Sequence, residues 1–138
     1  MDGADYAIMT LGSMTGAAKD AIDEARDAGK NVGLIKIKTF SPFPIDALLK
    51  SFDKIQALGV VDRSVGFRWN CGPMYQETMG VLYRLGRESG SFLPSMSFIG
   101  GLAGADITVG HFHRVIEATE NLLSSPAPTE PVWLNEKD

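Results

Sequence analysis

Apolar segments of two different periods alternate along this chain, and this alternation limits the fold more than any other feature of the sequence. Four short apolar runs have the length and side chains typical of buried strands: residues 6–12, 31–40, 55–62 and 95–100. The intervening segments repeat apolar residues at helical spacing or open on a helix-starting proline: residues 13–30, 44–52, 73–88 and 109–124. Strands that alternate with helices are joined by right-handed crossovers into a parallel sheet. We therefore predict an α/β fold, an open, doubly wound, mostly parallel sheet of four to five strands with helices on both faces.

The chain has 138 residues, which fits one domain with a core of its own. We assign residues 1–125 to this α/β domain. Residues 126–138 begin with "PAPTEP", the greater part of the proline-rich linker "SSPAPTEP" (124–131), and continue with the apolar "VWL". We expect Val132 to Leu134 to return to the same domain as an edge strand.

Composition excludes several classes of function. The net charge is −4 and the lysines and arginines are scattered, so no basic stripe suits a nucleic-acid backbone. No apolar run approaches the roughly 20 residues of a membrane span, and the polar start "MDGADY" is not a signal peptide. We expect a cytoplasmic chain with neither a nucleic-acid nor a membrane partner.

The single cysteine, Cys71, cannot form an internal disulfide or supply the four thiolates that an iron–sulfur cluster normally takes. It lies in "SVGFRWNCGPMYQE" (64–77), just before a predicted helix whose N-terminus could lower a thiol pKa. Nucleophilic catalysis also needs a base, and the sequence shows no dedicated one. We interpret Cys71 as incidental to chemistry.

Two glycine-rich segments follow predicted strands, where ligands of open α/β sheets bind. "GSMTG" (12–16) could cradle a phosphate, but it has neither the Rossmann spacing nor the Walker lysine, and an ordinary strand-to-helix turn explains it. In "GGLAGAD" (100–106), the glycines permit tight turns and close packing. Asp106 is expected to be a cap or turn residue before the last helix.

His111 and His113 are two residues apart on a predicted helix, where side chains at that spacing do not face each other. No carboxylate–histidine motif accompanies them. We expect solvent or interface contacts from both, with no metal or general-base role.

Three segments together resemble a known family: "DYAIMTLGSMTGAAKDAIDEARDAGKNVGLIKIKTFSPFP", "VVDRSVGFRWNCGPMYQE" and "FIGGLAGADIT". In this order they are similar to domain II of the alpha subunit of pyruvate and related 2-oxoacid:ferredoxin oxidoreductases, a relative of the transketolase C-terminal domain. The resemblance covers about residues 4–124.

The resemblance implies part of an enzyme that oxidatively decarboxylates a 2-oxoacid. Thiamine diphosphate, magnesium and iron–sulfur clusters would lie on other domains or subunits, and ferredoxin and CoA would be partners of the whole complex. This chain would be a non-catalytic module for structure and assembly, inactive alone, with no catalytic, cofactor-binding or metal-binding residues of its own.

After "DRSV" the sequence departs from the small residues that the family leads us to expect, because "GFRWNC" follows. The substrate therefore stays open between pyruvate, another 2-oxoacid and oxalate. We interpret the loop 63–72 as a docking surface, because Trp and Arg dominate interface hot spots. Its candidate contact residues are Arg63, Phe67, Arg68, Trp69 and Asn70; the alternative is that Phe67 and Trp69 cover the domain's own core.

Two other classes of protein share this pattern. A free-standing flavodoxin-like or nucleotide-binding α/β protein would need a better phosphate site than "GSMTG". A small cysteine-dependent hydrolase would need an activated Cys71.

Overall fold

The computed structural model describes residues 3–11, 15–37, 43–63, 73–100, 107–128 and 130–134. Within them, a five-stranded sheet has the order β2-β1-β3-β4-β5, and every neighbouring pair is parallel. The strands are β1 (Tyr6–Leu11), β2 (Val32–Ile37), β3 (Leu58–Asp62), β4 (Ser95–Ile99) and β5 (Val132–Trp133). The helices are α1 (Thr15–Asp27), α2 (Ile45–Phe52), α3 (Pro73–Ser89) and α4 (Val109–Asn121). The predicted doubly wound α/β architecture is confirmed.

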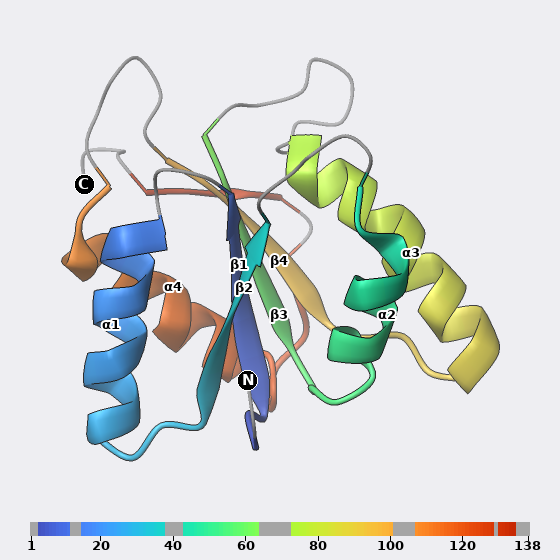
Figure 1. Cartoon of the computed structure of the whole chain (residues 1–138), viewed down its shortest axis with the longest axis horizontal. Helices are drawn as coiled ribbons and strands as arrows, with labels where there is room; N and C mark the ends of the chain where they lie inside the picture. The colour runs from blue at the N-terminus through green and yellow to red at the C-terminus, as the bar shows by residue number, and fades with distance from the viewer. Residues whose placement is uncertain are drawn as a thin grey trace.

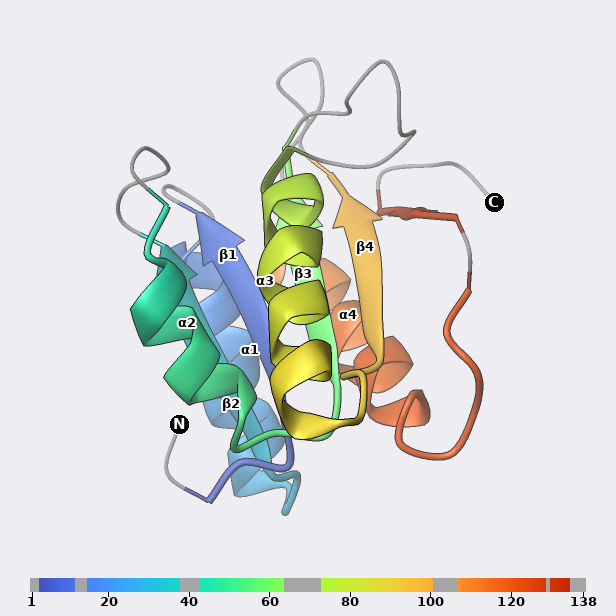
Figure 2. The ribbon, with the colours of Figure 1, turned by 90° about the vertical axis from the view of Figure 1, so that its right-hand side faces the viewer.

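Two pairs of helices sandwich the sheet, α1 with α4 on one face and α2 with α3 on the other (Figures 1 and 2). Successive strand residues alternate between these two cores: Ile8 of β1 packs toward α1 and α4, and Met9 packs toward α2 and α3. All five residues of β3 are buried. This burial on both faces explains the near-continuous apolar character of the strand sequences.

The helix ends follow signals that are visible in the sequence. Gly29 has a φ of 92°, and the amides of Gly29 and Lys30 donate to the carbonyls of Arg26 and Ala25, which closes α1 with a Schellman motif. On α4, the predicted apolar face is buried: Phe112, Val115, Ile116, Thr119 and Leu122.

The third strand is shorter than predicted. It begins at Leu58, whereas the apolar run begins at Ile55. Ile55 instead closes the end of α2, where its amide donates to the carbonyl of Phe52, and Gln56 donates to the carbonyl of Asp5. Ile55 is nonetheless buried in the core under α2 and α3. Ile55 is buried like a strand residue but does not pair with a neighbouring strand. The apolar run in the sequence therefore predicted a strand longer than β3.

The C-terminal segment returns to the sheet as the edge strand β5, as expected, and it pairs with β4. The Leu134 amide donates to the carbonyl of Ile99 at 2.8 Å, and the Leu134 side chain is 1% exposed. Arg114 of α4 donates to the Leu134 carbonyl at 3.3 Å. The last described residue is thus held by both the sheet and a helix.

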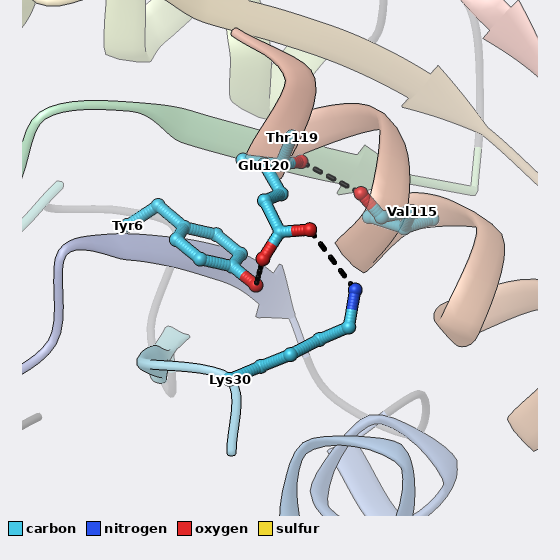
Figure 3. Close-up of polar contacts among 5 residues, drawn as sticks. All are labelled: Tyr6, Lys30, Val115, Thr119 and Glu120. Atoms are coloured by element: carbon cyan, nitrogen blue, oxygen red, sulfur yellow. Dashed lines mark hydrogen bonds and ion pairs between the residues drawn. The ribbon is translucent and has the colours of Figure 1, made fainter. Parts of the chain in front are cut away.

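A polar network joins three elements beside the start of β1 (Figure 3). The Tyr6 hydroxyl donates to one carboxylate oxygen of Glu120 and the Lys30 ammonium donates to the other, both at 3.0 Å. Burial, and then the bond to Glu120, raises the pKa of the Tyr6 hydroxyl, whereas the Lys30 bond lowers the pKa of Glu120. The network ties β1, the turn before β2 and the end of α4 together.

Candidate functional site

The carboxyl ends of β1, β3 and β4 lie at the same edge of the sheet (Figure 2), where ligands of open α/β sheets bind. Much of this edge is outside the described residues: segments 12–14, 38–42, 64–72 and 101–106. The described part consists of the strand ends and the starts of the helices. Its one charged and buried side chain among the described residues is Asp62, the last residue of β3.

Asp62 binds the first turn of α3. One carboxylate oxygen accepts from the Met74 amide at 2.8 Å, and the other accepts from the Tyr75 amide at 3.1 Å. These amides lack partners within the helix because they lie in its first turn, which also contains no acidic side chain. Asp62 therefore caps the N-terminus of α3, although it belongs to β3 and is separated from the helix by the segment 63–72.

Burial dominates the electrostatics of Asp62. The side chain is 6% exposed, and this desolvation raises its pKa to about 6, against the two amide bonds, which lower it. An aspartate with such a pKa could exchange protons near neutral pH. Both of its oxygens already accept from α3, however, so the geometry favours a structural role.

Two buried hydroxyls, Thr10 Oγ1 and Ser97 Oγ, have no hydrogen-bond partner in the described part of the chain. They lie on opposite faces of the sheet. Ser97 is in register with Val60, which in turn pairs with Met9, and Thr10 is the residue after Met9. The two hydroxyls consequently do not converge on one ligand.

Of the five predicted interface residues, the structure describes Arg63 only. Arg63 is exposed and directly follows Asp62. Phe67, Arg68, Trp69 and Asn70 lie outside the described residues, as does Cys71, so the docking interpretation of this loop stays a prediction.

The two histidines form contacts within the chain. The hydroxyl of Thr108 accepts from the His111 amide, and His111 Nδ1 accepts from the Thr108 amide at 3.0 Å, which is a reciprocal capping box. His113 Nε2 lies 2.8 Å from Glu24 and joins α4 to α1. Solvent or interface contacts were expected here; the structure adds helix capping by His111 and helix pairing by His113, whose side chain is also 43% exposed.

The N-cap of α4 is Thr108 and not Asp106. Asp106 lies outside the described residues, so its alternative role as a turn residue stays a prediction. "Asp-Ile-Thr" offers two acceptors, and the helix begins one residue after the second. Most of "GSMTG" and "GGLAGAD" is likewise outside the described residues.

The sequence reasoning did not assign a role to Asp62. Two signals could have found it: an aspartate ends an apolar strand, and the later helix begins at Pro73, which the sequence precedes with Cys71 and Gly72, neither of them a Ser, Thr, Asp or Asn that could cap it with a side-chain oxygen. Among the described residues, no three His, Cys, Asp or Glu side chains gather where they could hold a metal ion. None of the described helices is long and apolar enough to cross a bilayer.

Comparison with known proteins adds the family. The family model for pyruvate:ferredoxin oxidoreductase core domain II matches residues 4–112. NADH-dependent phenylglyoxylate dehydrogenase subunit alpha of Aromatoleum evansii is 74% identical over 139 residues, covering 100% of this chain and 32% of that protein. Pyruvate synthase subunit PorA of Methanosarcina barkeri is 30% identical over 138 residues, covering 100% of this chain and 33% of that protein. The chain thus spans about a third of the length of these relatives.

Solved structures share the fold. A split gene transketolase, an inactive beta4 tetramer, matches 88% of this chain and 40% of its own with a TM-score of 0.66 and 16% identity. The 2-oxoglutarate:ferredoxin oxidoreductase from Magnetococcus marinus matches 85% of this chain and 18% of its own, with a TM-score of 0.57 and 19% identity. The transketolase-like fold is confirmed, and the flavodoxin-like alternative is not favoured. The chain belongs to the pyruvate:ferredoxin oxidoreductase core domain II family, the 2-oxoacid oxidoreductase family that its sequence resembles.

Proposed function

We propose that this chain is a non-catalytic structural and assembly domain of a thiamine diphosphate-dependent 2-oxoacid oxidoreductase whose substrate is phenylglyoxylate or a similar aryl 2-oxoacid. The substrate class rests on one observation, the 74% identity across the whole chain to a phenylglyoxylate dehydrogenase subunit, against 30% to a pyruvate synthase subunit. In this proposal residues 1–125 form the domain, and residues 126–138 form its linker and edge strand.

The donor groups of the chain support a non-catalytic role. One cysteine is too few for an iron–sulfur cluster. The buried carboxylate at the carboxyl edge, Asp62, already accepts two amides of α3. We therefore assign thiamine diphosphate, magnesium and iron–sulfur clusters to other domains or subunits, and the cytoplasm as the location, consistent with a chain that cannot form an internal disulfide.

The overall reaction of the assembled enzyme would convert phenylglyoxylate, CoA and NAD⁺ into benzoyl-CoA, CO₂ and NADH. The bond between the carbonyl carbon and the carboxylate breaks, the acyl group joins the CoA sulfur, and two electrons leave as hydride on NADH. The relative's printed name favours NADH as the electron carrier, where the sequence alone led us to expect ferredoxin.

The test is a comparison of substrates in the complex assembled from this chain and the remaining oxidoreductase polypeptides. NADH formation should need CoA, and kcat/KM should be at least about tenfold higher for phenylglyoxylate than for pyruvate, because a pocket that fits an aryl group gains about 1–3 kcal/mol or more over a methyl-bearing substrate. Pyruvate preferred over phenylglyoxylate would contradict the substrate proposal. Turnover by this chain alone would contradict its non-catalytic role.

A further inference from the structure

An exposed aromatic pair lies at the C-terminal end of α3. Tyr83 is 60% exposed and Phe92 is 63% exposed, and their rings stack with centroids 6.3 Å apart. Phe92 belongs to the connection from α3 to β4, which runs at the amino ends of the strands (Figure 2), whereas Asp62 ends β3 at the carboxyl ends. Soluble proteins bury most large aromatic side chains, and exposed ones that cluster mark interaction surfaces.

The fold holds the Phe92 ring in this exposed position. A Cβ atom on Gly86 would lie 2.2 Å from the Phe92 ring. The ring therefore packs against α3 in the space that a side chain at residue 86 would occupy. The turn before Phe92 is fixed as well, by Gly90 with a φ of 84° and by bonds between Ser89 and Ser91. A ring already fixed before binding loses little conformational entropy when a partner covers it.

A pocket of about 270 Å³ opens beside the same ring. Phe92 forms one of its walls. The other apolar lining comes from Phe52, Ile55, Leu85, Leu93 and Pro94, and the polar lining comes from Asp53, Gln56, Ser89 and Ser91. Pockets for small molecules usually measure about 300–1,000 Å³. This one has room for a single side chain of a protein partner, whose apolar part would lie against the Phe92 wall.

The charged residues beside the aromatic pair indicate which chemical group the partner carries. Arg84 pairs with Glu88 at 3.3 Å, whereas Arg87 is exposed and makes no ion pair within the described residues. Arg87 lines a second hollow together with Tyr83. An arginine beside exposed aromatic rings is the composition of an interface hot spot, and it favours a carboxylate on the partner.

We propose that Tyr83, Arg87, Phe92 and the pocket beside them, here called the α3 surface, dock a segment from the rest of the oxidoreductase that carries an apolar side chain next to a carboxylate. The inference rests on the proposed function, since the chain spans about a third of its relatives' length and most of such an enzyme lies outside it. It adds a second contact surface, distinct from the loop 63–72.

The test measures binding of this chain, immobilised, to the purified remaining polypeptides. Phe92→Ala and Arg87→Glu should each weaken the equilibrium affinity at least about tenfold. Two matched controls lie elsewhere: Leu123→Ala, which shortens another exposed apolar side chain, and Lys19→Glu, which reverses an exposed charge on α1. Both should bind within about twofold of the unchanged chain.

Gly86→Ala provides a variant whose fold should not suffer. Alanine is favoured over glycine within a helix, so stability should hold or rise, while the new methyl group displaces the Phe92 ring and weakens binding. Unchanged affinity in Phe92→Ala and Arg87→Glu, with normal binding by the original chain, would overturn the α3 surface and leave the proposed function intact. No binding by the original chain would overturn both. A dimer of the isolated chain that Phe92→Ala abolishes would identify a second copy as the occupant and overturn the proposed partner.

Discussion

Gly59 of β3 and Thr119 of α4 approach so closely that no side chain fits between them. A Cβ atom at residue 59 would lie 2.3 Å from Thr119 Oγ1. That hydroxyl donates to the Val115 carbonyl at 2.8 Å (Figure 3), and Thr119 is fully buried. The glycine therefore sets the distance between the central sheet and the helix that covers it.

Gly59→Ala should lower the free energy of unfolding by about 2 kcal/mol, because the methyl group pushes α4 away or breaks the Thr119 bond. Urea denaturation followed by circular dichroism would measure this. Gly80→Ala on α3 is the matched control: a Cβ there meets nothing within 4 Å, so helix propensity should keep or raise stability. Equal stability of the two variants would contradict the close approach of β3 and α4.

Asp62 should make stability depend on pH. Its pKa is about 6 in the folded chain and about 4 when unfolded, so between these values the folded state binds more protons. The Asp62 contribution to the free energy of unfolding is therefore greatest below pH 4 and falls by about 3 kcal/mol as pH rises to 6 and above.

Asp62→Asn removes this titration. The difference in unfolding free energy between this variant and the original chain, measured in urea from pH 4 to 7, should change by that amount. A flat difference would mean that burial does not govern this carboxyl.

Leu134 should anchor the C-terminal segment. It is 1% exposed and packs in the core beside α4, so Leu134→Ala should cost about 2–4 kcal/mol, and deletion of residues 130–138 should lower the denaturation midpoint further. Leu123→Ala, at a site 41% exposed, should cost well under 1 kcal/mol. Equal midpoints for the deletion and the full chain would show that β5 adds nothing to stability.

The loop 63–72 yields a prediction from sequence. Trp69→Ala should leave the midpoint unchanged and weaken association with the remaining polypeptides, because a docking tryptophan contributes to binding and not to the core. Cys71→Ser should leave assembly and turnover nearly unchanged. If it abolished turnover while assembly persisted, the thiol would have a chemical role.

The isolated chain should bind no thiamine diphosphate tightly. Calorimetric titration with thiamine diphosphate and magnesium should give no saturable heat, since we assign that site to other domains. The assembled complex serves as the positive control. Stoichiometric binding by the chain alone would contradict the assignment.

The repeating features of the fold could be predicted from the sequence, because strands and helices leave periodic signals. The buried face of α4 and the glycine that ends α1 follow directly from spacing and from the left-handed conformation. The start of β3 could not be predicted, because Ile55 is buried whether it belongs to a strand or to a turn.

Contacts between distant segments left no such signal. The bonds from Asp62 to α3 and from Tyr6 to Glu120 join residues that only the folded topology brings together. The stacking of Phe92 on Tyr83 could not be predicted either. It depends on the space that Gly86 leaves for the Phe92 ring, and only the folded structure shows that the ring lies there. The sequence predicted which loops follow the carboxyl ends of the strands. It did not predict that Asp62 binds the first turn of α3 across the segment 63–72.

The bonds from Asp62 to the Met74 and Tyr75 amides also make the segment 63–72 a natural place for added sequence. With both of its ends held together by the domain itself, a longer segment costs only the slowly growing entropy of a larger loop, about 0.6 kcal/mol for each doubling of length. A reporter peptide or an extra recognition element could be inserted there without rebuilding the sheet.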